Sequence, residues 1–429
     1  MSLVVEPAPV VVTAEAPVEA WRRWLGPVTF VVFGLVDILV LGLYSHHGDA
    51  TFAFSQPFAK VTVPDLRLPA AETCYACGAL TLLLAAVRAF MPVGIVWRRV
   101  MIAVVVFLFI VALLCWSDAG NATSFNVVNL LQGTLNTSIP IMLGALTGVI
   151  CSRSGVVNIG IEGQLLLGAF VAAMVTSGTH SLWLGLVSGA LAGCLVGALL
   201  AAFAIGYAVD QIILGVVLNT LVLGLTGYLY DQLMVPNANT LNSPATFSAY
   251  KIPLLGDIPI LGPVLFDSTI FLYITYLALA LVQMALFSTR WGLRTRAIGE
   301  HPVAADTVGI SVLALRYRNV IMAGILAGIG GAYLTIGSVG AFAKGMSSGE
   351  GYIALAAMIF GRYTPFGAVG AALLFGFTTQ LQSILSSLGV PISSNLLLMT
   401  PYIVTIIVVA GLVGKVRAPK AEGVPYIKS

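Results

Sequence analysis

The chain has 429 residues, of which 59% are hydrophobic and only 9% are charged, and its formal net charge is +3. Its mean hydropathy is +1.01. A water-soluble domain cannot bury this much apolar surface, and a bilayer core accepts helices of roughly 20 apolar residues. The composition therefore excludes a soluble protein and predicts an all-α polytopic membrane protein.

Twelve apolar segments are expected to cross or enter the membrane. The segment at 349–361 is too short for an ordinary crossing, so we expect a broken helix buried against protein. Residues 1–20 are rich in Pro, Ala, Val and Glu and lack a basic start, which indicates a disordered cytoplasmic tail rather than a signal peptide. The expected segments are 27–44, 69–91, 100–116, 126–150, 161–178, 182–206, 211–230, 268–287, 319–341, 349–361, 366–388 and 395–413.

The distribution of Lys and Arg predicts the orientation. If the N-terminus is cytoplasmic, twelve crossings return the C-terminus to the cytoplasm, and sixteen of the 20 Lys and Arg residues fall inside. Only Lys60, Arg67, Lys251 and Lys344 fall outside, as the positive-inside rule requires. The loop at 231–267 is then external, as a lid, a docking surface or a simple connector.

Two Ser-Gly segments suggest an internal repeat. SGVVNIGIEGQLLLGAF occupies 154–170, SGEGYIALAAMIFGR occupies 348–362, and each has an isoleucine five residues after its serine. Five crossings between 100 and 230 would match five between 268 and 413 in the opposite orientation. Inverted repeats with interrupted helices are typical of transporters, although chance similarity between helices rich in Gly and Ala is an alternative.

Polar residues within the apolar segments are candidates for lining a pathway, because burial at membrane depth is costly. For Glu162 and Glu350, capping of a helix N-terminus is an equal alternative. For Asn219, an interhelical hydrogen bond is the favoured interpretation. Asn129, Gln132 and Asn136 share nearly one helix face, which is a second candidate lining. The candidate pathway residues are Asn158, Glu162, Gln164, Asn219, Glu350, Asn129 and Asn136.

The loop at 288–318 is the longest basic segment and predicts a contact with a soluble partner. Five arginines surround a short Ala-rich stretch that begins at His301-Pro302 and ends at Gly309. Proline is favoured in the first turn of a helix, and glycine is favoured after its end. We therefore expect a short amphipathic helix on the cytoplasmic side, where ATP hydrolysis by a partner would be coupled to transport.

Catalytic motifs are missing from the sequence. It contains no Gly-rich phosphate-binding loop, no H-E-x-x-H and no metal-spaced histidine cluster among its four histidines. The C-x-x-C of Cys74 and Cys77 lacks a second ligand pair, which favours a packing role. We therefore expect no catalytic residue, no metal site, no cofactor and no nucleic-acid partner, and the chain cannot hydrolyse ATP by itself.

Three separated motifs resemble the permease subunits of bacterial ABC importers for nucleosides, which are related to ribose and branched-chain amino-acid permeases. They are SGVVNIGIEGQLLLGAF, GEHPVAADTVGI and GYIALAAMIFGRYTPFGAVGAALLFG, and the resemblance covers about residues 124–413. It implies a ten-helix core with inverted five-helix repeats. The domains would be a tail at 1–26, about two extra helices at 27–99, the core at 100–417 and a cytoplasmic tail at 418–429.

The resemblance also assigns the ATPase-coupling helix. Gly299, Glu300, Pro302, Ala304 and Ala305 fit the family motif, and His301 replaces its usual Asn. With the two residues that complete the stretch, the expected coupling set is Gly299, Glu300, His301, Pro302, Ala304, Ala305, Asp306 and Gly309.

The implied assembly contains a cytoplasmic ABC ATPase, a second permease subunit and an extracytoplasmic substrate-binding lipoprotein. It would import a small molecule by alternating access across the bacterial plasma (inner) membrane, in contact with lipid. Both termini would be cytoplasmic. Two alternatives stay open: an ABC permease for simple sugars such as ribose, and an ATP-independent carrier or channel.

Overall fold

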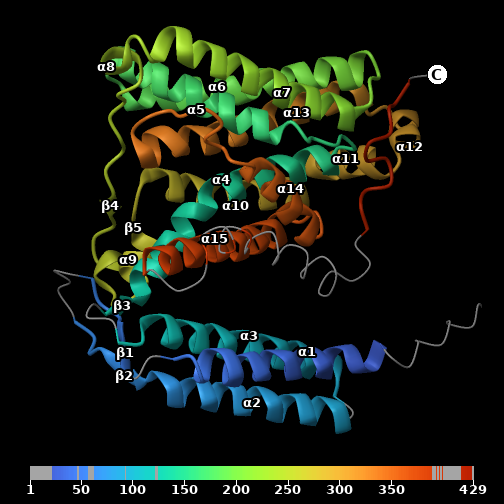
Figure 1. Cartoon of the computed structure of the whole chain (residues 1–429). Helices are drawn as coiled ribbons and strands as arrows, with labels where there is room; N and C mark the ends of the chain where they lie inside the picture. The colour runs from blue at the N-terminus through green and yellow to red at the C-terminus, as the bar shows by residue number, and fades with distance from the viewer. Residues whose placement is uncertain are drawn as a thin grey trace, which may run out of the picture. The chain divides into compact units, whose positions relative to one another are not determined.

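The computed structural model describes residues 22–427 except 46–47, 57–61, 92, 121–123, 389–392, 394–395, 397–398 and 400–416. The chain divides into two compact units (Figure 1). Unit 1 comprises Met1–Ala53 and Pro64–Phe125, and unit 2 comprises Phe54–Val63 and Asn126–Ser429.

The described residues contain ten helical segments that are long and apolar enough to cross a membrane. They match the expected segments from 27–44 to 366–388, and the short apolar helix Glu350–Phe360 matches the expected broken element. The prediction of an all-α polytopic membrane protein is therefore confirmed. The last expected segment, 395–413, lies outside the described residues.

Unit 1 consists of three long helices and a short antiparallel pair of strands, in which Asp49 lies opposite Pro69. Phe30, Met101 and Val105 are buried together at the helix contacts. We expected the extra N-terminal part to end at residue 99, but α3 packs against α2 and belongs to unit 1. The elements are α1 (Arg22–Val36), η1 (Asp37–Gly42), β1 (Asp49–Ala53), β2 (Leu66–Pro69), α2 (Ala70–Phe90) and α3 (Ile95–Asp118).

Unit 2 contains the other helices, after the two-residue strand β3 (Phe125–Asn126) at the unit boundary. The strands β4 and β5 pair antiparallel. Its elements are α4 (Val127–Arg153), α5 (Ile161–Thr179), α6 (Leu182–Ala201), η2 (Ala202–Gly206), α7 (Gln211–Leu229), η3 (Tyr230–Met234), α8 (Ala238–Leu241), β4 (Tyr250–Lys251), η4 (Leu255–Asp257), α9 (Leu261–Phe266), β5 (Asp267–Ser268), α10 (Ile270–Ser288), α11 (Arg290–Glu300), α12 (Pro302–Thr307), α13 (Val312–Ala332), η5 (Tyr333–Val339), α14 (Glu350–Phe360) and α15 (Pro365–Ser387).

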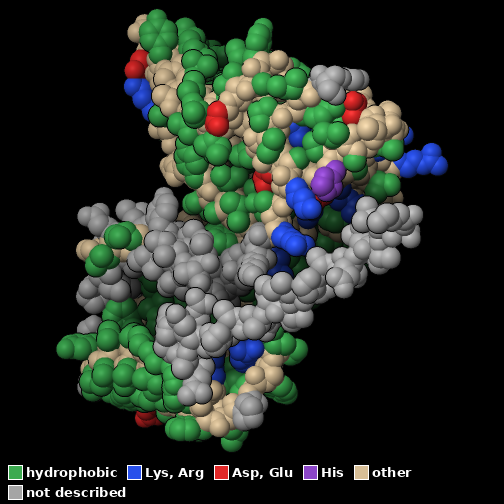
Figure 2. Space-filling view, turned by 90° about the vertical axis from the view of Figure 1, so that its right-hand side faces the viewer, with side chains coloured by type: hydrophobic (Ala, Val, Ile, Leu, Met, Phe, Trp, Pro, Cys, Tyr) green, Lys and Arg blue, Asp and Glu red, His purple; other side chains and the backbone are tan. Residues whose placement is uncertain are grey.

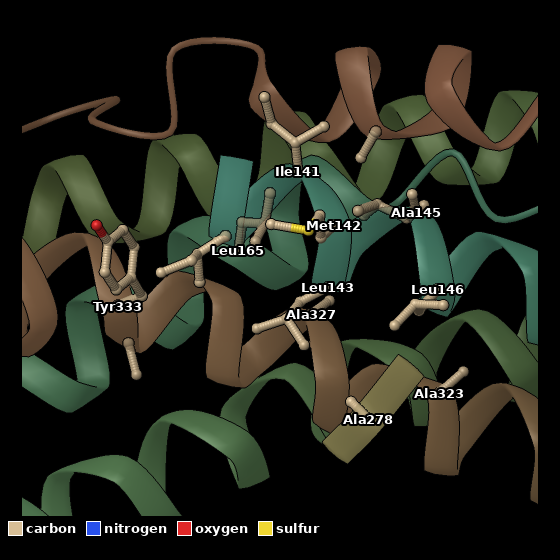
Figure 3. Packing of buried hydrophobic residues seen from close by; sticks show 14 of the residues in the cluster. Ile141, Met142, Leu143, Ala145, Leu146, Leu165, Ala278, Ala323, Ala327 and Tyr333 are labelled. Atoms are coloured by element: carbon tan, nitrogen blue, oxygen red, sulfur yellow. The ribbon is translucent and has the colours of Figure 1, made fainter. Parts of the chain in front are cut away.

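The core of unit 2 lies around α4, which is mostly buried inside the protein. A helix of this kind needs protein neighbours around its whole circumference. Figure 3 shows Leu143 and Leu146 of α4 close to Ala323 and Ala327 of α13. Small side chains on α13 allow the two helices to approach closely.

The helices of unit 2 pack in a reciprocal pattern. The helix α4 packs against α14 and α15, whereas α13 packs against α5 and α6. The helices α4 and α13 run antiparallel, because Thr147 Oγ1 donates to the Ala323 oxygen at 2.9 Å while Arg316 Nε donates to the Ser154 oxygen at 3.1 Å. The series α13–α14–α15 therefore repeats α4–α5–α6 in the opposite direction, which confirms the inverted repeat for these six helices.

Candidate translocation pathway and coupling site

Two breaks in the helices correspond to the Ser-Gly segments. The first lies between α4 and α5, and the second lies between η5 and α14. Gly155 and Gly349 have φ angles of 84° and 85°, a conformation that residues with a Cβ rarely adopt. The glycines of the two motifs thus share a left-handed conformation, but the turns differ, because Ser154 has a φ of −92° and Ser348 a φ of 46°.

Glu162 joins the two breaks. It lies in the first turn of α5, and its Oε1 accepts hydrogen bonds from Ser347 Oγ at 2.6 Å and from Gly349 N at 2.9 Å. Its Oε2 accepts from Gly351 N at 2.7 Å. A carboxylate at a helix N-terminus satisfies free N–H groups and interacts favourably with the helix dipole. Glu162 therefore caps the helix that follows the opposite break.

Glu350 occupies the first turn of α14 and lies within electrostatic range of Glu162. Its Oε2 is buried and has no hydrogen-bond partner in the part of the chain that the structure describes. An unsatisfied carboxylate oxygen at this depth is costly, and such groups usually serve a function. Glu350 is thus a stronger candidate than Glu162 for contact with a substrate or a proton.

Asn219 connects α7 to both breaks. Its Oδ1 accepts from Gly163 N at 2.8 Å, and its Nδ2 donates to the Ile159 oxygen at 2.9 Å. The same Nδ2 donates to Tyr352 Oη at 3.0 Å. The structure therefore gives Asn219 interhelical hydrogen bonds, the interpretation favoured from the sequence.

Asn158 and Gln164 form a buried pair beside the first break. Asn158 Nδ2 donates to Gln164 Oε1 at 3.2 Å. Asn158 Oδ1 and Gln164 Nε2 are buried without a partner within the described residues. The two amides thus keep one free acceptor and one free donor beside the first break, and a Cβ at Gly197 of α6 would lie 3.3 Å from Gln164 Nε2.

The polar face of α4 is used mainly within the protein. Gln132 accepts from Gln56 Nε2 at 2.7 Å and donates to the Asp267 oxygen at 2.9 Å. Asn136 Oδ1 accepts from Ser268 Oγ at 3.1 Å. Only the Asn129 side chain, of the three on this face, is exposed. The polar face therefore attaches α4 to the segment before α10. None of its three polar residues belongs to either break.

The short helix expected between His301 and Gly309 is α12, with Pro302 at its first position and Gly309 at a φ of 82° after its end. His301 precedes it but forms no side-chain capping hydrogen bond. Ala305 is buried against Ile298 and Val312, so its side chain faces this chain. The large apolar residues exposed in this stretch are instead Val303 and Val308.

Of the other expected coupling residues, some form hydrogen bonds within this chain and others are exposed. The Gly299 oxygen accepts from Ala421 N at 2.9 Å, and Glu300 Oε2 accepts from Lys420 N at 3.4 Å. Ala304 is exposed, and Asp306 is partly buried. Figure 2 shows Lys and Arg side chains on the end of unit 2 that carries α11 and α12.

Sequence reasoning did not identify Ser347, Tyr352 or Arg316 as site residues. Ser347 directly precedes the second Ser-Gly motif, which could have singled it out. Tyr352 is unremarkable in sequence, because its bond to Asn219 is a long-range contact. Arg316, one of the five arginines of the basic loop, is buried and bonded to the first break.

Comparisons with known proteins agree with this architecture. The family described as branched-chain amino acid transport system / permease component matches residues 130–410. The guanosine ABC transporter permease protein NupQ of Bacillus subtilis is 43% identical over 310 residues, or 70% of this chain and 96% of that protein. The nucleoside ABC transporter permease protein NupC of Lactococcus lactis is 38% identical over 317 residues, or 71% and 99%.

A second Bacillus subtilis protein, the guanosine ABC transporter permease protein NupP, is 25% identical over 258 residues, or 59% of this chain and 73% of that protein. No solved structure matches the chain. The family match covers most of unit 2, NupQ and NupC are matched over nearly their whole length, and the described helices form the inverted repeat of a transporter. The chain therefore belongs to the branched-chain amino acid transport system permease family, as a multi-pass transport subunit of an ABC transporter whose ATPase is a separate partner.

Proposed function

We propose that this chain forms the translocation pathway for nucleosides in an ATP-driven importer that works by alternating access. The observation that carries the proposal is the similarity over 96% and 99% of two relatives named for guanosine and nucleoside transport. The meeting of both helix breaks at Glu162 supports it, since interrupted helices form the substrate sites of many transporters.

The residues near the breaks suit an uncharged polar cargo. A nucleoside offers hydroxyls, ring nitrogens and carbonyl or amino groups, so it needs donors and acceptors in the wall of the pathway. The unpartnered atoms of Asn158, Gln164 and Glu350 supply both kinds. We propose that these three residues are the nearest to the substrate, whereas Glu162 and Asn219 hold the breaks in place. Asn129 and Asn136 would contribute only at the end of the pathway.

The ATPase would dock on the end of unit 2 formed by α11 and α12. Val303 and Val308 are exposed there, and exposed apolar side chains beside charged ones are typical of a protein interface. The arginines of this end support a cytoplasmic location by the positive-inside rule. Both termini would then be cytoplasmic, and the protein would lie in the bacterial plasma membrane.

The complete importer would contain a second permease subunit and an extracytoplasmic substrate-binding lipoprotein. Two guanosine ABC transporter permease proteins, NupQ and NupP, in one organism support a heteromeric pair. Exposed apolar residues on α6 and α7, such as Leu191, Leu195 and Leu221, provide surface for lipid and for the second permease.

Substrate competition distinguishes a nucleoside importer from an importer of simple sugars. A strain that lacks the gene should lose uptake of labelled nucleosides, and expression of the chain should restore it. Excess unlabelled guanosine, adenosine or uridine should abolish the restored uptake, whereas excess ribose should not, because ribose lacks the base. Competition by ribose, or restored uptake of ribose alone, would favour the sugar permease.

A further inference from the structure

Residues 417–427, here called the C-terminal strap, lie against the end of unit 2 that carries the coupling helix. Arg316, at the start of α13, is only 1% exposed and attaches the strap. Its Nη1 donates to the Val424 oxygen at 3.0 Å and its Nη2 to the Ala421 oxygen at 3.5 Å, while its Nε donates to the Ser154 oxygen. Burying a guanidinium is costly unless its donors are satisfied. One side chain thus connects the strap to the first break.

The strap is also bonded to α11 and packed against α12. Ala421 N donates to the Gly299 oxygen at 2.9 Å, so the strap backbone continues the hydrogen bonding of the last turn of α11. The ring of Tyr426 packs against the cluster of Ile298, Ala305 and Val312. The strap and α12 therefore share a small apolar core.

On its other side the strap reaches the end of α4 and the first break. Glu422 interacts with Ser152, Arg153 and Tyr363, and burial raises the pKa of its carboxyl while these three partners lower it. Gly423 has a φ of 76°, and a Cβ there would lie 3.4 Å from Val157 Cγ2. The strap consequently lies between the coupling helix and residues 152–157, which lead into α5 and Glu162.

The strap, like the coupling stretch, carries exposed apolar side chains. Val424 and Ile427 are 54% and 79% exposed, and Val303 and Val308 of the coupling stretch are 67% and 74% exposed. Apolar side chains on a water-facing end are costly unless a partner covers them. Tyr426 of the strap packs on the same apolar cluster as Ala305 of α12, so this cluster connects the segments that carry the two exposed pairs.

We propose that the C-terminal strap is a second part of the ATPase docking surface and that it transmits the displacement of α12 to the first break. The inference rests on the proposed function, in which α12 receives the ATPase. The exposed residues Val424 and Ile427 contact the ATPase. Arg316 is a positioning residue, which holds the strap on the break without touching the substrate.

Docking is tested with the purified permease complex and increasing amounts of its ATPase. Val424→Asp with Ile427→Asp should weaken ATPase binding about tenfold, as loss of an apolar contact in an interface does. Melting of the permease should not change, because both side chains are exposed. Deletion of residues 417–429 should weaken binding at least as much, and deletion of 428–429 should have no effect.

Transmission is tested at saturating ATPase by the number of nucleosides imported per ATP hydrolysed. Arg316→Leu removes three hydrogen bonds and should lower this ratio about fivefold, the lower end of allosteric coupling effects. Arg318→Leu is the matched control, because it removes the same charge from an exposed position two residues away and should leave the ratio unchanged. A purely structural role would lower the amount of folded complex but not the ratio.

The possible results distinguish a failure of the strap proposal from a failure of the proposed function. Unchanged ATPase binding in the Val424→Asp, Ile427→Asp protein, with an unchanged ratio in the Arg316→Leu protein, would overturn the strap proposal. Val303→Asp with Val308→Asp tests α12 independently. If these changes weaken ATPase binding and the strap changes do not, only the strap proposal fails. If neither pair weakens binding, the proposed docking site itself is wrong.

Discussion

Glu162→Leu is expected to lower nucleoside uptake at least tenfold at matched expression and to lower the melting temperature. The change removes the acceptor of Ser347 Oγ, Gly349 N and Gly351 N. Each buried donor left without a partner costs about 1–3 kcal/mol. Glu162→Gln should be intermediate, because it keeps one oxygen but places an N–H donor opposite another N–H. Uptake and thermal melting of the three proteins test this order.

Asp210→Ala is the matched control for loss of a carboxylate cap. Asp210 accepts from Ile212 N and Ile213 N, both at 2.9 Å, at the exposed start of α7. Its loss should cost about 0.5–2 kcal/mol and leave uptake per folded protein unchanged. A fully active Glu162→Leu protein would show that the junction of the two breaks is not needed for transport.

Gly328→Val should prevent stable folding of unit 2. A Cβ at Gly328 would lie 2.9 Å from Ala190 Cα and would also meet the Gly189 oxygen, and these backbone atoms cannot give way as a flexible side chain can. Overpacking a tight contact costs about 1–3 kcal/mol, and more where backbones must separate. Because this contact holds α6 against α13, we expect a large fall in folded yield and in melting temperature.

Gly224→Val tests whether the effect is specific to the helix crossing. Gly224 lies on α7, and a Cβ there would meet no atom of the described residues within 4 Å. We expect unchanged melting and uptake for this variant. If Gly328→Val melts like the unaltered protein, α6 and α13 do not pack as the structure shows.

The membrane-spanning helices were predictable because bilayer thickness sets their length and hydropathy marks them. The short helix α14 was predictable because counting 349–361 among twelve crossings leaves sixteen of the 20 Lys and Arg residues on one side of the membrane. The inverted repeat was suggested by two Ser-Gly motifs, which need the same positive φ at Gly155 and Gly349. Each of these features depends on local sequence.

The contacts of the site were harder to predict because they join distant segments. Glu162 suggested a helix cap, but its partners lie at residues 347–351, far along the chain. The polar face of α4 has the pattern of a pathway wall in sequence, but Gln132 and Asn136 bind Gln56 and Ser268, which are distant in the chain. Ala305 lies in a helix too short for hydrophobic periodicity to reveal its buried side. The composition of residues 418–429 predicted only a cytoplasmic tail, and nothing local in that sequence indicates its bonds to Arg316.

The most direct test of the central claim is nucleoside transport by the complete complex in proteoliposomes, with ATP supplied on one side only. If the chain is the permease of an ATP-driven importer, labelled nucleoside offered with its binding protein will accumulate when ATP is present on the side that α12 faces. Accumulation will fail with ATP on the other side or with a non-hydrolysable analogue. Equal nucleoside movement without ATP would contradict the account and identify an ATP-independent carrier or channel.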